Sequence, residues 1–128
     1  MIQVKDVVKS FDGNVVLNHV SANFEDGKVN MIIGQSGSGK TVLMKSMIGL
    51  HQIDGGEIIF DTRNGQENLA EMKEKEVRML HREVGMLFQG AALFDSMTVQ
   101  ENVMYPLEMF SDMTDEEKVA RARFCLER

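Results

Sequence analysis

The chain has 128 residues, of which 43% are hydrophobic and 27% charged, so it can bury one core of ordinary domain size. Its net charge of −6 offers no basic surface for nucleic acid, and its single cysteine excludes an internal disulfide. No apolar run approaches the length of a membrane span, so any membrane connection is expected to go through a partner.

Hydrophobic patterns predict five strands and four helices along the chain. Alternating or short continuous apolar runs predict strands over 2–8, 15–24, 29–33, 57–60 and 84–88, the third being apolar enough for burial on both faces. Helical spacing and composition predict helices over 41–50 and 69–81. Capping boxes at Thr98–Glu101 and Thr114–Glu117 predict two further helix starts, and Pro106 is expected to kink the first of these helices or begin a new one.

A glycine-rich loop lies between the third predicted strand and the first predicted helix. It reads Gly34-Gln35-Ser36-Gly37-Ser38-Gly39-Lys40-Thr41 and matches the pattern G-x-x-x-x-G-K-[ST] at every fixed position. Glycines allow successive backbone N–H groups to turn toward a phosphate, and the positive end of the following helix points at the same place. Lys40 supplies a cation for the β- and γ-phosphates, and the Thr41 hydroxyl can ligate Mg²⁺. The sequence therefore predicts a site for Mg²⁺ and a nucleotide at these eight residues.

The segments around this loop distinguish among the families that use it. Phe11 follows the first predicted strand, and Val84–Gln89 is a predicted strand that ends in a glutamine. With these features, residues 2 to about 106 resemble the N-terminal part of the ATP-binding cassette domain of ABC transporters. The resemblance implies an α/β P-loop NTPase fold. It also implies a division into the first part of the nucleotide-binding core, 1–94, and the start of a helical subdomain, 95–128.

The resemblance implies roles for two more residues. Phe11 would stack on the adenine ring of ATP, although an apolar residue at a strand end is the simpler reading of the residue alone. Gln89 would meet Mg²⁺ and the attacking water when the site is closed, although an isolated glutamine is usually a surface residue. Lys40 and Gln89 are therefore the candidate catalytic residues, and Thr41 and Gln89 the candidate metal ligands.

The segment Phe88–Met97 carries a narrower resemblance. It is similar to the ATPase subunit of bacterial MCE/Mla-type transporters, which implies a phospholipid cargo, transmembrane permease subunits and an MCE lipid-shuttling partner. The alternative is the ATPase of an importer for amino acids, methionine or metal ions. Other classes that stay open are a soluble cassette protein without a transporter, a small-molecule kinase and a non-catalytic nucleotide-binding fragment.

Several parts of a complete cassette do not occur in these 128 residues. There is no Leu-Ser-Gly-Gly-Gln-like segment, no apolar strand ending in Asp-Glu after Gln89, and no later switch histidine. The sequence therefore looks truncated inside the helical subdomain. The complete protein is expected to be an ATPase that acts as a homodimer, bound to permease subunits on the cytoplasmic face of the inner membrane. The chain by itself is expected to hold nucleotide weakly and not to hydrolyse it efficiently.

Overall fold

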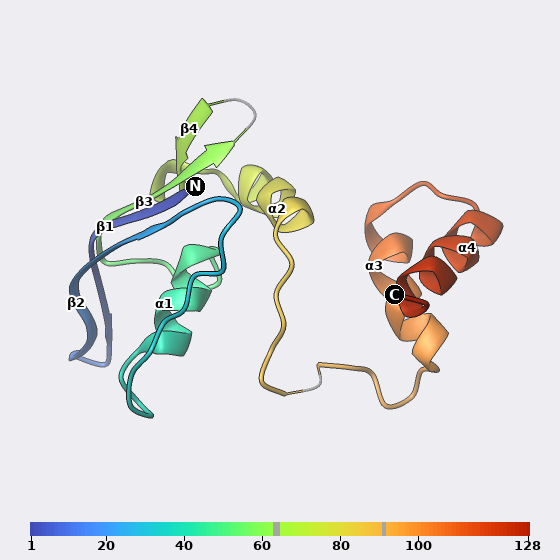
Figure 1. Ribbon diagram of the computed structural model, residues 1–128, viewed down its shortest axis with the longest axis horizontal. Helices are drawn as coiled ribbons and strands as arrows, with labels where there is room; N and C mark the ends of the chain where they lie inside the picture. The colour runs from blue at the N-terminus through green and yellow to red at the C-terminus, as the bar shows by residue number, and fades with distance from the viewer. Residues whose placement is uncertain (63–64, 91) are drawn as a thin grey trace. The chain divides into compact units, whose positions relative to one another are not determined.

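A computed structural model describes residues 1–62, 65–90 and 92–128 of the chain. The described residues form two compact units, Met1–Gly85 and Met86–Arg128. The first unit combines a sheet with helices, and the second contains helices α3 and α4 (Figure 1). The predicted division at residues 94 and 95 refers to the complete family domain and stays a prediction.

The first unit is built on a four-stranded antiparallel sheet of order β2-β1-β3-β4. The strands are β1 (Ile2–Phe11), β2 (Asn14–Phe24), β3 (Gly55–Thr62) and β4 (Gly65–Asn68). These bounds confirm the strands predicted over 2–8, 15–24 and 57–60. Asp12 and Gly13 turn β1 into β2 with φ values of 48° and 79°, and positive φ at both positions is typical of a two-residue hairpin.

A bulge in β1 places Val4 and Val7, which are an odd number of residues apart, in the same core. Val4 and Val7 are 1% and 0% exposed, although strict alternation would turn them to opposite faces. The pairing of β1 with β2 shifts register between them, and Asp6 has φ 53° within the shift. The Asp6 N–H donates to Ser21 Oγ at 2.9 Å instead of to a strand carbonyl. The bulge thus turns both valines inward.

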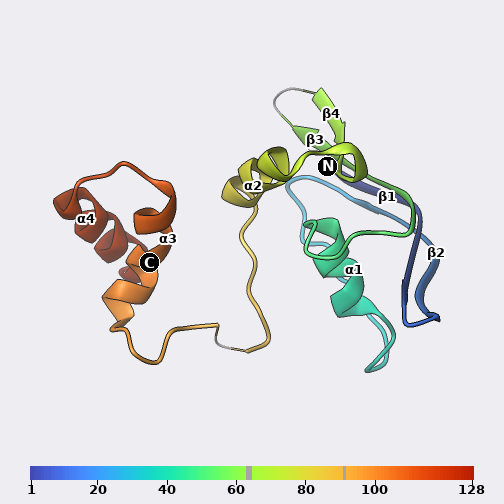
Figure 2. The ribbon, with the colours of Figure 1, turned by 180° about the vertical axis from the view of Figure 1, so that it is seen from behind.

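Three short helices cover the first unit: α1 (Lys40–Met47), the 3₁₀ turn η1 (Leu69–Glu71) and α2 (Glu74–Glu83). The helix predicted over 41–50 is confirmed in shorter form, and the one predicted over 69–81 is divided into η1 and α2. Figures 1 and 2 show α1 beside the sheet, with the connection from β2 running along it. Sheet, turn and helices share one core, formed by Val4, Val7, Leu17, Leu43, Met47, Ile58, Phe60, Leu69 and Leu80.

Two of the predicted strands, 29–33 and 84–88, are wrong for this structure. Both segments are irregular, and Val29, Ile33 and Leu87 are 96%, 85% and 93% exposed. A strand buried on both faces needs neighbours whose N–H and C=O groups complete its ladder. Within the described residues, the sheet consists of β1 to β4 and pairs with neither segment. Both segments are apolar, but none of β1 to β4 pairs with them.

The second unit consists of α3 (Val99–Phe110) and α4 (Asp115–Leu126) after an irregular segment. Both predicted capping boxes are confirmed: Thr98 Oγ1 accepts the Glu101 N–H at 3.2 Å, and Thr114 Oγ1 accepts the Glu117 N–H at 3.3 Å. Pro106 lies inside α3. The expectation that Pro106 begins a new helix is therefore wrong. Over residues 1–62, 65–90 and 92–128, we find no helix that is both long and apolar enough to cross a membrane.

Candidate nucleotide-phosphate site

The glycine-rich loop leads into α1, as the sequence predicts, but the element before it is β2 and not a strand over 29–33. The shape of the loop depends on glycines. Gly37 and Gly39 have φ values of 77° and 90°, which side chains rarely allow. A Cβ on Gly34 would lie 2.6 Å from Ser38 Oγ, and one on Gly39 would lie 3.1 Å from the carbonyl oxygen of Val16. The loop therefore approaches its own Ser38 at Gly34 and packs against the backbone of β2 at Gly39, so a larger residue at either position would displace a neighbour.

Lys40 places its ammonium group within this loop. Lys40 Nζ donates to the carbonyl oxygens of Gly34 and Gln35, both at 2.6 Å, and lies 3.5 Å from Ser38 Oγ. All three partners are neutral oxygens, so the positive charge of Lys40 is not neutralised by a carboxylate in these contacts. An anion that binds at the loop would therefore contact a cation whose position the backbone carbonyls already fix.

The first turn of α1 presents unpaired backbone donors at the same place. Gly39 is the N-cap residue and contributes no side-chain oxygen, while its carbonyl accepts the Leu43 N–H at 2.8 Å. The first turn contains no acidic residue, and Thr41 is exposed. The free N–H groups and the positive end of the helix dipole therefore favour an anionic group. Loop, Lys40 and helix start together have the donor set that a phosphate group requires.

Phe11 is the last residue of β1 and lies next to the turn that leads into β2. Its neighbour Ser10 pairs with Val15, and the next residue, Val16, contacts Gly39. The Phe11 ring is 38% exposed and meets the His51 ring edge-on, with centroids 5.3 Å apart and an interplanar angle of 75°. The exposed remainder of the ring is available for stacking, and the expected contact of Phe11 with a base stays a prediction.

Asp54 is a residue of this region that no sequence motif identifies. Its carboxylate accepts the Ser10 N–H at 2.6 Å and the ammonium of Lys9 at 3.3 Å. The hydrogen bond from the Ser10 N–H holds the pKa of Asp54 below its ordinary value, and the nearby ammonium group of Lys9 lowers it further. Lys9 also lies 5.0 Å from the centroid of the Phe11 ring. Asp54 therefore fixes the strand end that carries Phe11, and no local pattern reveals a contact across 44 residues.

Gln89 belongs to the other unit, Met86–Arg128, where it is exposed in the irregular segment before α3. The structure thus brings together Gly34 to Thr41 and places Phe11 in the same unit, and it does not join Gln89 to them within one unit. The role of Gln89 stays a prediction. Within the described part of the chain, no group of three or more His, Cys, Asp or Glu side chains could hold a metal ion.

Comparison with known proteins identifies related cassettes. The sequence profile of the family described as ABC transporter matches residues 17–128. The phosphonates import ATP-binding protein PhnC of Fusobacterium nucleatum is 32% identical over all of this chain and 53% of its own length. The methionine import ATP-binding protein MetN of Campylobacter jejuni is 37% identical over 84% of this chain and 32% of its own length. The chain therefore spans between about a third and about half of these two relatives.

Solved structures agree with the sequence comparison. The dimeric structure of MJ0796, a bacterial ABC transporter cassette, superposes with a TM-score of 0.85 and 30% identity, over 99% of this chain and 56% of that one. A post-hydrolysis state of MJ0796 bound to ADP and Pi superposes with the same TM-score at 28% identity. This likeness supports an α/β fold of the P-loop NTPase class, as predicted. Because the family profile covers most of the chain, the chain belongs to the ABC transporter family.

Proposed function

We propose that this chain supplies the phosphate- and base-binding part of the ATP-binding subunit of an ABC transporter. The observation that carries the proposal is the position of Lys40 Nζ, 2.6 Å from two carbonyl oxygens of a glycine-rich loop that leads into α1. ATP would bind with its phosphates between the loop amides and Lys40, and with its adenine against Phe11. The names of the relatives, which are ATP-binding proteins, support the same nucleotide.

Mg²⁺ would enter this site together with the nucleotide. The described residues contain no cluster of acidic, His and Cys side chains for a metal alone, so phosphate oxygens would supply much of its coordination. The Thr41 hydroxyl is the protein ligand nearest the start of α1, and Gln89 is the proposed second ligand when the site closes. When bound, Mg²⁺ would neutralise charge on the β- and γ-phosphates.

The complete protein is proposed to hydrolyse ATP as a dimer of such subunits on transmembrane permease partners at the cytoplasmic face of the membrane. The related cassette MJ0796 forms a dimer, and PhnC and MetN are named as import proteins, which supports this assembly. Within this chain, Lys40 and Gln89 are the proposed catalytic residues. The carboxylate that would activate water is proposed to lie outside these 128 residues.

We propose two classes of cargo, and more observations support the first than the second. Import of a small solute is favoured by relatives named for phosphonates, methionine and, in the case of CysA 1 of Chromobacterium violaceum, sulfate or thiosulfate. A phospholipid cargo with an MCE partner rests on the Phe88–Met97 segment alone. Transport assays with the complete protein and its permease would separate a soluble solute from a lipid.

The binding proposal is tested with MgATP and the purified chain by isothermal titration calorimetry. Lys40→Ala should weaken MgATP binding at least tenfold, because it removes a cation from the phosphate site. Lys45→Ala is the matched control: it removes the same charge from the last turn of the same helix, away from the loop, and should leave affinity unchanged. Equal affinities for the wild type and the Lys40 variant would refute the phosphate role of the loop.

A further inference from the structure

The Phe11 ring contacts the ring of a residue that is far from it in sequence, His51. The two ring centroids lie 5.3 Å apart, and the ring planes meet at 75°. Aromatic rings prefer such edge-on contacts, which stabilise a pair beyond the area that it buries. His51 is half-buried and Phe11 is 38% exposed, so the contact leaves part of the Phe11 ring accessible to a further partner.

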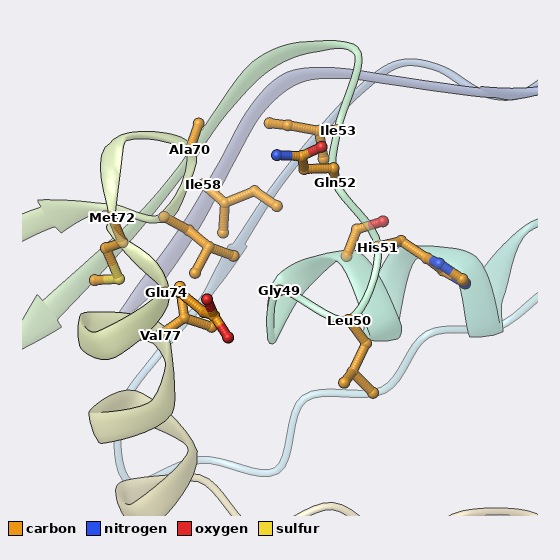
Figure 3. Close-up of a pocket in the computed structure, with 12 residues that line it drawn as sticks. Gly49, Leu50, His51, Gln52, Ile53, Ile58, Ala70, Met72, Glu74 and Val77 are labelled. Atoms are coloured by element: carbon orange, nitrogen blue, oxygen red, sulfur yellow. The ribbon is translucent and has the colours of Figure 1, made fainter.

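The backbone of His51 is attached to the end of α1. Gly49 has φ 75° and turns the chain out of the helix. The Lys45 carbonyl accepts the Leu50 N–H at 2.9 Å and the His51 N–H at 3.4 Å. Figure 3 shows the His51 side chain on this segment, pointing away from Ala70 across the pocket. The His51 ring is therefore carried by the end of the same helix that begins at the phosphate loop.

A few residues further on, the same segment is attached to β1. The Asp54 N–H donates to the Val8 carbonyl at 2.8 Å, and the Asp54 carboxylate accepts the Ser10 N–H at 2.6 Å. The segment that follows α1 thus joins the last turn of that helix to the end of β1. His51 lies between the two attachments, so its ring has a defined place beside the strand end.

The orientation of the Phe11 ring matters for stacking. An exposed side chain at a strand end can change rotamer, and a ring that is already oriented loses less conformational entropy when it binds. Two groups restrict Phe11: the His51 ring, and Lys9 Nζ at 5.0 Å from the ring centroid. We propose that His51 is a positioning residue that holds the Phe11 ring in the orientation that stacks on adenine. This inference rests on the proposed function, because it requires that Phe11 contacts the base of ATP.

The test measures the affinity of the 128-residue chain for MgATP and for magnesium tripolyphosphate by isothermal titration calorimetry. His51→Ala removes the ring and should weaken MgATP binding about threefold, because an edge-on aromatic contact is a modest interaction. Affinity for magnesium tripolyphosphate, which has no base, should not change. His51→Phe keeps an aromatic ring at this position and should bind MgATP like the wild type.

Gln52→Ala is the matched control. Gln52 is the next residue of the same segment and is exposed, so its truncation should leave both affinities unchanged. A loss in this control equal to that of His51→Ala would mean that the segment, and not the His51 ring, determines the affinity, and would overturn the inference.

NMR of the chain without nucleotide tests the ring contact directly. Comparison with Phe11→Ala identifies the Phe11 ring signals, and His51→Ala should shift them, because a neighbouring ring changes the local magnetic field. Amide signals outside 8–13 and 49–54 should keep their positions, which shows that the variant folds. Phe11 ring signals that do not move in His51→Ala would overturn the inference.

Three calorimetric results would also overturn it. His51→Ala binds MgATP like the wild type, or it loses affinity for tripolyphosphate as well, or His51→Phe fails to restore MgATP binding. Phe11→Ala, measured beside these variants, separates the inference from the proposed function. If Phe11→Ala weakens MgATP binding and His51→Ala does not, only the inference is wrong. If neither variant weakens it, the proposed contact of Phe11 with the base is wrong as well.

Discussion

The loop Gly34–Thr41 and the segment around Gln89 were both identified as motifs, yet they have different structures. The loop is shaped by its own backbone: Ser38 N–H donates to Gln35 C=O at 3.2 Å, and Lys40 Nζ reaches two loop carbonyls. The segment around Gln89 is irregular and exposed. Most of the contacts that shape the loop therefore lie within its own eight residues, with β2 packed against it at Gly39. A motif at the end of a strand takes its geometry from the strand's neighbours.

The largest effect is expected from Gly39→Val in the loop. Gly39 has φ 90°, which residues with a side chain rarely adopt, and a Cβ there would lie 3.1 Å from the carbonyl oxygen of Val16. The loop would therefore have to change its shape to accommodate valine. We expect at least a tenfold loss of MgATP affinity by calorimetry. Gly90→Ala, next to Gln89, is the matched control because its Cβ would meet nothing within 4 Å. A comparable loss in the control would mean that both segments are equally constrained.

A several-fold effect is expected from Phe11→Ala. Loss of ring stacking should weaken ATP binding by roughly two- to tenfold, as for other aromatic pairs. Binding of magnesium tripolyphosphate, which lacks a base, should not change, and Phe11→Tyr should bind ATP like the wild type. Equal losses for ATP and tripolyphosphate would show that Phe11 acts through the loop instead of through the base.

In the second unit, Thr98→Ala should lower the free energy of unfolding of the region containing α3 by ~1 kcal/mol. The Thr98 hydroxyl accepts the Glu101 N–H at 3.2 Å, and alanine leaves this donor without its cap. Thr98→Ser keeps an oxygen at the cap and should retain most of the stability. Hydrogen exchange of the α3 amides is the measurement, and an unchanged exchange rate would show that the helix does not depend on its cap.

A smaller, pH-dependent effect is expected from Asp54→Asn. The pKa of Asp54 is lower in the folded chain than its ordinary value of 3.8, so the ionised carboxylate stabilises the fold. This contribution is present above pH 3.8 and is lost as the pH falls through the folded pKa. The variant should therefore melt at a lower temperature near pH 6, and its difference from the wild type should shrink toward pH 2.

A matched variant separates this effect from a general loss of charge. Asp115→Asn removes a carboxylate that is itself exposed and lies 3.6 Å from Lys118, and it should change the melting temperature little at either pH. If both variants behave alike, the contact between Asp54 and the Ser10 N–H does not hold the strand end.

The smallest effect is expected from Gln89→Ala in this chain. Gln89 is exposed in the irregular segment, so its removal should change MgATP affinity less than twofold. A large loss would contradict the contrast between the two motifs and place Gln89 in the binding site of the open state. In the complete protein, the same variant should lower ATP hydrolysis, because Gln89 is proposed to act only on closure.

Several elements of both units could be predicted from local sequence patterns. Alternation located β1 and β2, and the capping boxes located α3 and α4, because these signals lie within one element. The bulge at Asp6 and the contact of Asp54 with Ser10 were missed, since each depends on residues far apart in sequence. The strand predicted over 29–33 is wrong for a related reason. Its apolar side chains indicate that the segment is to be buried, but they do not identify the strands that would pair with it.

The sequence by itself determined the phosphate loop, because Gly34 to Thr41 specify their own backbone turns and place Lys40 among their own carbonyls. It also determined the family, since the same residues and their flanks match ABC transporters. Only the tertiary structure decided that the Phe11 ring packs on the His51 ring, that Asp54 holds the end of β1, and that Ser46 is buried with its hydroxyl unpaired. Those outcomes depend on which distant segments pack together, and such packing is fixed by the whole core instead of by any local pattern.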